Sequence, residues 1–376
     1  MAQYSSRKPQ IKLEQLLIIF VAVWLCSVLI VLSQFWHGRL SLDSNIGVQK
    51  IHSTDAPRVG GIAIAVGLVI AYGLADSAQA ALLRPLLIAA VPVFAAGLIE
   101  DLTKRVGPMP RLLAAMASGA LACGLSGLSM QNTGVPALDW ALQWTPLAVV
   151  FTAFAVGGMT NAINIVDGFN GMASGICIII LLSFSAIASN LNDVPLMLLC
   201  LSMACVALGF AVVNWPSGSL FLGDGGAYLL GLCVAWTAVL LVMRHTEVNG
   251  WAAVMVCAYP LLEAGYSMRR RARRSMKKMG SADKRHLHHF IHRRLLVSWM
   301  PSSNKLILNS LTSPVVWLLT GIPATWGIYF ADNTPMLLLG FALATFAYGV
   351  LYARLTQFQW CFSPVTMKRG VLTTGM

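Results

Sequence analysis

Four polar motifs lie where long apolar segments of this chain begin or end, and their residue types suit chemistry on phosphates. They read Glu100-Asp101-x-x-Lys104, Asn161-x-x-Asn164-x-x-Asp167-Gly168, Phe221-x-Gly223-Asp224 and His286-x-His288-His289. Carboxylate oxygens bind hard divalent cations, and basic side chains bind phosphate. Because a carboxylate at membrane depth costs free energy, such groups are usually retained for function.

The first motif places two adjacent acids one helical turn before a lysine. Glu100 and Asp101 could hold a divalent ion, or an acid could steer a proton while Lys104 orients a phosphate. Adjacent acids at a membrane interface also occur as helix caps. The motif by itself leaves both interpretations open.

The second motif has a regular spacing of three residues. If the segment is helical, Asn161, Asn164 and Asp167 lie on roughly one face. Gly168 and Gly171 permit a broken turn or a close backbone approach. An ordinary Asn- and Gly-rich turn is the alternative, but the regular spacing beside apolar residues favours a polar binding face.

The third motif follows Asn214 in the next polar connection and places Asp224 at the expected start of an apolar helix. Its glycine neighbours leave the carboxylate sterically open, which suits Mg²⁺ with its retained waters. An acid is also favoured at a helix N-terminus, so capping is again an alternative.

The histidine motif lies in a basic loop. No cysteine is nearby, which argues against a structural zinc site, and the neighbouring Lys284 and Arg285 favour binding of an oligophosphate. A solvated loop on anionic lipid explains the basic residues but not the clustered histidines.

A weaker signal lies upstream, where His52 and Arg58 precede Gly60-Gly61. The paired glycines permit tight packing or the approach of a phosphate.

The composition is that of an integral membrane protein. The 376 residues are 57% hydrophobic and only 11% charged, with a mean hydropathy of +0.72. Twelve of the 26 Lys and Arg lie between Arg269 and Lys305, which predicts a basic membrane loop and no nucleic-acid partner. The 8 cysteines contain no C-x-x-C pair, so we expect them to be reduced and structural.

A membrane-spanning helix needs about 20 apolar residues. Eleven segments are predicted to span: 14–36, 60–75, 85–99, 111–128, 144–160, 171–189, 195–213, 225–243, 250–268, 305–330 and 334–353. The expected fold is therefore an all-α polytopic bundle. We expect one domain over residues 1–376, which includes the basic loop 269–304 with its histidine motif.

The distribution of basic residues predicts the orientation. With these spans, 21 of the 26 Lys and Arg and all four polar motifs fall on one side, which the positive-inside rule makes cytoplasmic. The N-terminus then faces outward. The first segment is too long for a signal peptide and is expected to be retained as a span.

Taken in order, the motifs resemble those of the polyprenyl-phosphate N-acetylhexosamine-1-phosphate transferases of glycosyltransferase family 4. The resemblance covers roughly residues 45–295. Pro57-Arg58-Val59-Gly60-Gly61 resembles the first family motif, and the four motifs above are similar to its DDxxK, NxxNxxDG, FxGD and histidine motifs. Glu100 departs from the first acid of DDxxK. The His-Leu-His-His pattern is more similar to the hexosamine branch than to the muramoyl-pentapeptide branch.

The resemblance implies a Mg²⁺-dependent phosphotransferase, with Mn²⁺ as an alternative metal. It would transfer N-acetylhexosamine 1-phosphate from a UDP-sugar to undecaprenyl phosphate in the bacterial inner membrane and release UMP. This reaction initiates a cell-surface polysaccharide such as O-antigen, capsule or exopolysaccharide. The sugar, the polymer, and whether attack is direct or covalent stay open.

The resemblance also implies roles for the motif residues. Asp224 would bind the metal, and the catalytic group would comprise Glu100, Asp101, Lys104 and Asp167. The expected substrate-binding residues are His52, Arg58, Asn161, Asn164, Asn214, His286, His288 and His289.

Two questions about the protein as a whole stay open. The alternative function is a multispan transporter or flippase, because intramembrane acids also line transport pathways. Transport sites, however, lie near the bilayer midplane, whereas these motifs share one side. A homodimer is also open, since contacts between apolar helices leave little trace in composition.

Overall fold

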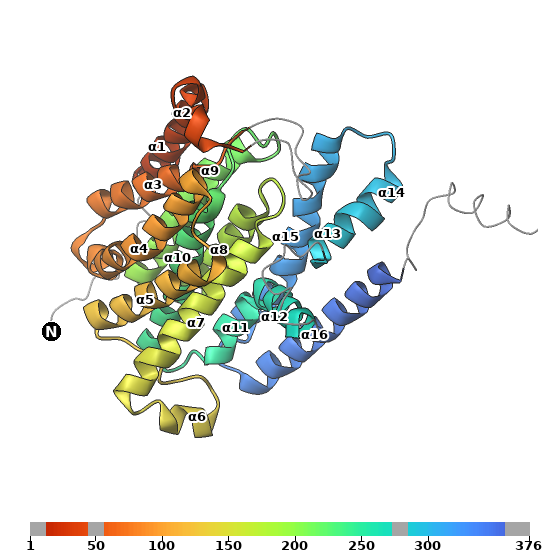
Figure 1. Cartoon of the computed structure of the whole chain (residues 1–376). Coiled ribbons are helices and arrows are strands. Elements are labelled where there is room, and N and C mark those ends of the chain that lie inside the picture. Colours follow the sequence, from red (N-terminus) through yellow and green to blue (C-terminus); the bar gives the residue numbers. More distant parts are fainter. Residues whose placement is uncertain (1–12, 44–55, 273–284, 358–376) are drawn as a thin grey trace, which may run out of the picture.

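The computed structural model describes residues 13–43, 56–272 and 285–357, and these residues form a bundle of helices (Figure 1). The first half contains α1 Leu13–Leu32, α2 Gln34–Ser41, α3 Gly60–Leu74, α4 Ser77–Thr103, α5 Pro108–Ser126, α6 Pro136–Ala141, α7 Thr145–Val166 and α8 Met172–Asn190. The second half contains α9 Val194–Asn214, α10 Gly223–Arg244, α11 Gly250–Val256, α12 Ala258–Ala272, α13 Leu287–Phe290, the π-helix η2 Ile291–Leu296, α14 Val297–Trp299, α15 Lys305–Tyr329 and α16 Thr334–Thr356. Two short strands, β1 Leu42–Asp43 and β2 Ala56–Pro57, pair antiparallel.

The helices confirm a polytopic membrane fold. Within the described residues, nine helices are long and apolar enough to cross a membrane, namely α1, α4, α5, α7, α8, α9, α10, α15 and α16. Of the other two expected spans, α3 has only 15 residues. The segment 250–268 is divided into α11 and α12 around Cys257. Pro260 explains the break, because its ring would clash with the carbonyl of Val256 in a continuous helix.

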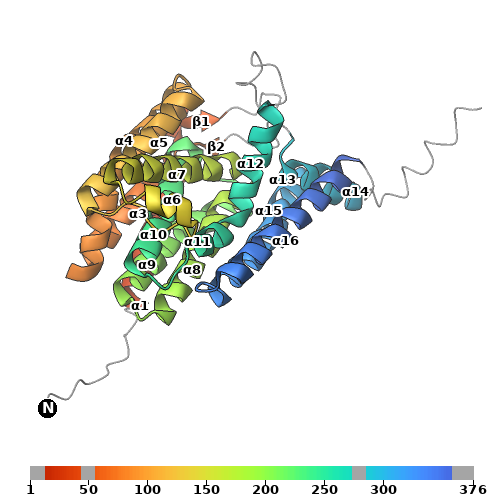
Figure 2. The ribbon, with the colours of Figure 1, turned by 90° about the horizontal axis from the view of Figure 1, so that it is seen from below.

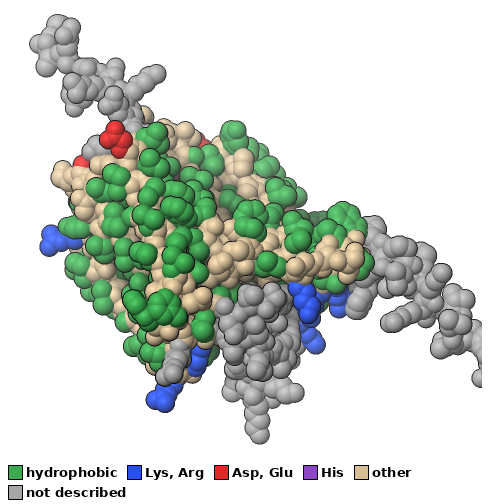
Figure 3. Space-filling view, turned by 90° about the horizontal axis from the view of Figure 1, so that it is seen from above, with side chains coloured by type: hydrophobic (Ala, Val, Ile, Leu, Met, Phe, Trp, Pro, Cys, Tyr) green, Lys and Arg blue, Asp and Glu red, His purple; other side chains and the backbone are tan. Residues whose placement is uncertain are grey.

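Helix α10 is the central element of the bundle (Figures 1 and 2). In its most apolar window 89% of the residues are buried, and α10 packs against α3, α4 and α7. By contrast, only 17% of the corresponding windows of α1 and α16 are buried. Hydrophobic side chains are spread across the face seen in Figure 3, as expected for a surface in contact with lipid.

Glycines bring three helices into backbone contact at the start of α10. A Cβ added to Gly97 of α4 would lie 2.6 Å from the Cα of Gly225. A Cβ on Gly61 of α3 would lie 2.4 Å from the backbone nitrogen of Gly226. Both contacts exclude any side chain. The last two turns of α4 and the first turn of α3 are therefore held directly against the N-terminus of α10.

We expect Gly97→Ala to destabilise the protein, because the added methyl group meets backbone that has no rotamer to change. The cost is about 1–3 kcal/mol, typical of an overpacked core. Thermal unfolding in detergent measures it. Gly124→Ala in α5 is the matched control, because its Cβ would meet nothing within 4 Å. An equal effect of the two substitutions would contradict the close packing of α4 on α10.

Candidate active site

Asp224 lies in the first turn of α10 and is surrounded by side chains from three other segments. The Nδ2 group of Asn164 in α7 donates a hydrogen bond to its Oδ1 at 2.7 Å. Its Oδ2 forms ion pairs with Arg111 of α5 and with Arg58, the latter at 3.3 Å. Only 6% of Asp224 is exposed. A buried carboxylate is thus balanced by two guanidinium groups, as burial of charge requires.

Asp101 holds the N-terminus of α10 in place. Its Oδ1 accepts the backbone N–H of Asp224 at 2.7 Å, and its Oδ2 accepts that of Gly225 at 2.8 Å. The first N–H groups of a helix have no partner within that helix, and here a carboxylate from α4 satisfies two of them. Arg58 also lies 3.3 Å from Asp101. Because both oxygens are engaged, the structure gives Asp101 a positioning role.

Gly223 makes this arrangement possible. Its φ of +73° lies in the left-handed region, and a Cβ there would approach Asp101 Oδ2 to 2.5 Å. The glycine of the F-x-G-D motif therefore serves both backbone conformation and the close approach of a carboxylate.

Backbone hydrogen bonds place Arg58 beside these acids. The N–H of Phe221 donates to Pro57 O at 2.8 Å, and the N–H of Gly60 returns a bond to Phe221 O at 3.0 Å. The segment before α3 is thereby bound to the segment before α10. This pairing accounts for the weak upstream signal in the sequence, since Arg58 is the part of it that reaches the acids.

Two of the three polar residues of the second motif, Asn161 and Asn164, face α10. Asn164 contacts Asp224, and one turn earlier Asn161 Oδ1 accepts a hydrogen bond from the Tyr228 hydroxyl at 3.2 Å. The Arg111 guanidinium lies over the Tyr228 ring at 5.7 Å.

Asp167 ends α7 and lines a cavity of about 140 Å³. The cavity is lined by Arg58, Asp167, Gly168, Phe169, Asn170, Asn214, Phe221, Leu222 and Gly223. Within the described part of the chain, the Asp167 carboxylate accepts no hydrogen bond. Burial raises the pKa of Asp167 to about 7. The nearby Arg58 lowers this pKa, whereas the negative charges of Asp224 and Asp101 raise it further. Its carboxylate faces the cavity and is available to a ligand.

The oxygen donors of this site fit a hard cation in type. Asp224, Asp167 and Asn164 offer carboxylate and amide oxygens of the kind that Mg²⁺ prefers. In the described ranges, no three His, Cys, Asp or Glu side chains are already grouped to hold a metal. Asp224 instead faces Arg58 and Arg111, so positive charge is already directed at the position where a cation would bind.

The histidine segment packs on the end of the second motif. His288 is fully buried, and a Cβ on Gly168 would lie 3.1 Å from its Nε2. The ring of Phe169 contacts the rings of His288, His289 and His292 with centroid distances of 4.9–5.8 Å. Burial lowers the pKa of His288 well below its usual value, and its neighbours His289 and His286 add to this. His288 is therefore a neutral imidazole.

The remaining predicted residues lie around this centre. Glu100 Oε2 accepts the N–H of Val106 at 2.7 Å and so shapes the turn after α4, while Lys104 is exposed at the end of that helix. Asn214 accepts the N–H of Gly171 at 2.5 Å and donates to Leu220 O at 2.7 Å. These contacts give Glu100 and Asn214 roles in holding backbone. His52 and Lys284 lie outside the described residues.

Sequence analysis missed Arg111 and Tyr228 as site residues. Arg111 follows Pro108 and Pro110 at the start of an apolar segment. A basic residue in that position is typical of the membrane interface, so its sequence context did not indicate a role in the site. Tyr228 lies four residues after Asp224, and this spacing on one helical face was the available signal.

We expect Asp167→Asn to stabilise the protein increasingly as pH rises. The pKa of Asp167 in the folded state is raised to about 7. At pH values above its pKa in the unfolded state, the ionised carboxylate therefore destabilises the folded protein. That penalty is absent at low pH, grows from about pH 4 and is complete above about pH 7. Thermal unfolding of both proteins at pH 5 and pH 8 measures it. A gain that is equal at the two pH values would refute the assigned ionisation.

Comparison with known proteins agrees with this geometry. Residues 83–242 match the model of Glycosyl transferase family 4. The chain is 27% identical to the undecaprenyl-phosphate alpha-N-acetylglucosaminyl 1-phosphate transferase of Escherichia coli, over 84% of this chain and 85% of the relative. It is 26% identical to the protein of that name from Salmonella typhimurium, over 84% and 85%. It is also 25% identical to a probable undecaprenyl-phosphate N-acetylglucosaminyl 1-phosphate transferase of Bacillus subtilis, over 75% and 79%. The matched region contains the centre of the site, from Asp101 to Asp224, and the similarity to these transferases covers most of the chain.

Proposed function

We propose that this protein transfers N-acetylhexosamine 1-phosphate from a UDP-sugar to undecaprenyl phosphate. The observation that carries the proposal is the convergence of Arg58, Arg111, Asp167 and Asp224 at one end of the bundle, with neutral His288 packed behind Gly168. Such a cluster suits an anionic, phosphate-bearing substrate.

The reaction requires that the negative charges of the two substrates be neutralised and that the attacking and leaving oxygens be aligned. An oxygen of the lipid phosphate forms a bond to the β-phosphorus of the UDP-sugar, the bond from that phosphorus to the bridging oxygen breaks, and UMP leaves. One phosphoanhydride is exchanged for another, so no further energy source is required. The difficulty is to bring two anions together, and Arg58 and Arg111 are placed to reduce their repulsion.

Asp224 is the proposed ligand of Mg²⁺, and the Asp167 carboxylate in the adjoining cavity is a second candidate ligand. A bound Mg²⁺ supplies neutralisation of the diphosphate charge. Asn164 keeps Asp224 oriented through its hydrogen bond, and Asp101 keeps the helix end that carries Asp224 in place.

The basic residues support a cytoplasmic placement of this site in a bacterial inner membrane. Arg58 and Arg111 lie at the site end, whereas Arg244 lies at the other end of α10. The position of the site at helix ends also favours transfer between a soluble donor and a membrane lipid over transport across the bilayer. The product would be the first lipid-linked sugar of a cell-surface polysaccharide.

Transfer of radiolabelled sugar tests the proposal. Purified protein in detergent should move label from UDP-N-acetylglucosamine, or another UDP-N-acetylhexosamine, into the organic phase when undecaprenyl phosphate and Mg²⁺ are present. Chelation with EDTA should abolish transfer, and added Mg²⁺ should restore it. Label that crosses sealed vesicles without entering lipid would instead show transport.

We expect Asp224→Asn to lower UMP release by about 100-fold or more, because it removes a charge from the centre of the site. The variant should still fold, since an amide oxygen can accept the Asn164 hydrogen bond. Glu14→Gln is the matched control, because Glu14 lies exposed at the start of α1. Near-normal release by Asp224→Asn, with circular dichroism confirming the fold, would remove Asp224 from the site.

A further inference from the structure

Glu263 is a buried acid that none of the sequence motifs contains. It lies in α12, and its side chain is fully buried. A buried carboxylate is costly unless it is hydrogen-bonded, so its partners indicate why it is tolerated there.

Three groups hydrogen-bond to the Glu263 carboxylate, and His288 Nδ1 lies 4.0 Å from its Oε2, beyond hydrogen-bond distance. His286 Nδ1 lies 2.8 Å from Oε1, while Oε2 accepts the N–H of Leu287 at 3.1 Å and the hydroxyl of Tyr348 at 2.8 Å. The acid of α12 thereby connects α16 to the start of the histidine segment.

These contacts determine where the proton of His286 lies. The Leu287 N–H can only donate, and a carboxylate that accepts from Leu287 and Tyr348 leaves Oε1 as an acceptor for His286. Nδ1 must then carry a hydrogen. The other ring nitrogen, Nε2, makes no hydrogen bond within the described ranges, and the His286 ring stacks on His288 at a centroid distance of 5.3 Å.

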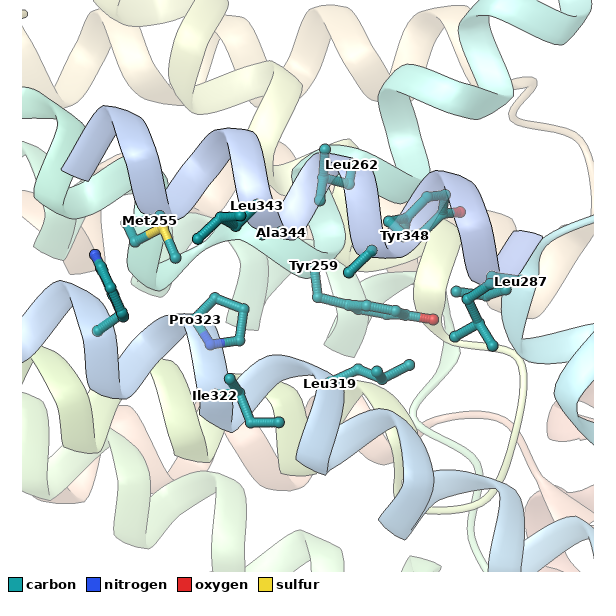
Figure 4. Close-up of a pocket in the computed structure, with 14 residues that line it drawn as sticks. Met255, Tyr259, Leu262, Leu287, Leu319, Ile322, Pro323, Leu343, Ala344 and Tyr348 are labelled. Carbon is teal, nitrogen blue, oxygen red and sulfur yellow. The ribbon is translucent and has the colours of Figure 1, made fainter. Parts of the chain in front are cut away.

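The surroundings of this group strengthen the interaction. An apolar cavity of about 360 Å³ between α12, α15 and α16 borders Tyr259, Tyr348 and Leu287. Figure 4 shows the hydroxyl ends of Tyr259 and Tyr348 pointing toward Leu287. Water is excluded on this side by apolar walls, and a hydrogen bond to a charged group is stronger in such surroundings.

We propose that Glu263 is the positioning residue of the histidine segment. It keeps the hydrogen of His286 on Nδ1 and thereby leaves Nε2 as an acceptor for a hydroxyl group of the sugar donor. This inference rests on the proposed function for the identity of the ligand, but the position of the proton can be measured without it.

Replacement by glutamine tests the inference sharply. Leu287 and Tyr348 both donate to one oxygen, so the amide oxygen of Glu263→Gln must take that place and the amide nitrogen must face His286. Nδ1 then becomes an acceptor, and the hydrogen moves to Nε2. The substitution changes the proton position with little change of shape.

Nitrogen NMR of protein labelled with ¹⁵N-histidine reads this directly. The protein has 7 histidines, and the His286 signals are those lost in His286→Ala. We expect a protonated Nδ1 in the native protein and a protonated Nε2 in Glu263→Gln. Tyr348→Phe is the control, because it keeps the carboxylate and should keep the native signals. Identical signals in the native protein and Glu263→Gln would overturn the inference.

A kinetic double-mutant cycle provides the second readout. We expect Glu263→Gln to raise the KM for the UDP-sugar by about tenfold, as for the loss of one hydrogen bond to the sugar. In the His286→Ala background the same substitution should add less than about twofold. A full effect in that background would show that Glu263 acts on the fold alone. If native protein transfers no sugar phosphate, the proposed function fails, and the nitrogen spectra still decide the role of Glu263.

Discussion

The structure depends on one interaction, the binding of the α10 N-terminus by the carboxylate of Asp101. A helix end buried in a membrane bundle carries N–H groups that have no partner, and each unpaired group is expensive. Asp101 satisfies two of them from another helix. Glycines at positions 97 and 223 allow the backbone and the carboxylate to come this close. The result is a rigid helix start in the centre of the bundle.

That rigid start determines where positive charge gathers. Asp224 projects from the first turn of α10, and Arg58 and Arg111 bind it from two different segments. Neither arginine neighbours Asp224 in sequence, and both are held beside a buried carboxylate. A site that already concentrates guanidinium groups is prepared to receive phosphate, because the charges need not be rearranged when the anion arrives.

The histidine segment is attached to this centre from the other side. Phe169 contacts three of its rings, and Gly168 leaves room for His288. Glu263 holds the beginning of the segment through His286. The end of the second motif, at Gly168 and Phe169, and the histidine segment thus share a single interface. This interface links the nucleotide-sugar side of the proposed site to α16.

The sequence by itself determined the all-α membrane fold, the location of the polar motifs at helix ends, and the common face of Asn161 and Asn164. These follow from local patterns, namely long apolar runs and a spacing of three residues. Only the tertiary structure decided that Asp101 binds backbone, that Arg111 pairs with Asp224, and that Glu263 holds His286. Such partners lie more than twenty residues apart, and whether a carboxylate is free or engaged depends on which helices pack together. Sequence spacing within one helix carries no information about that packing.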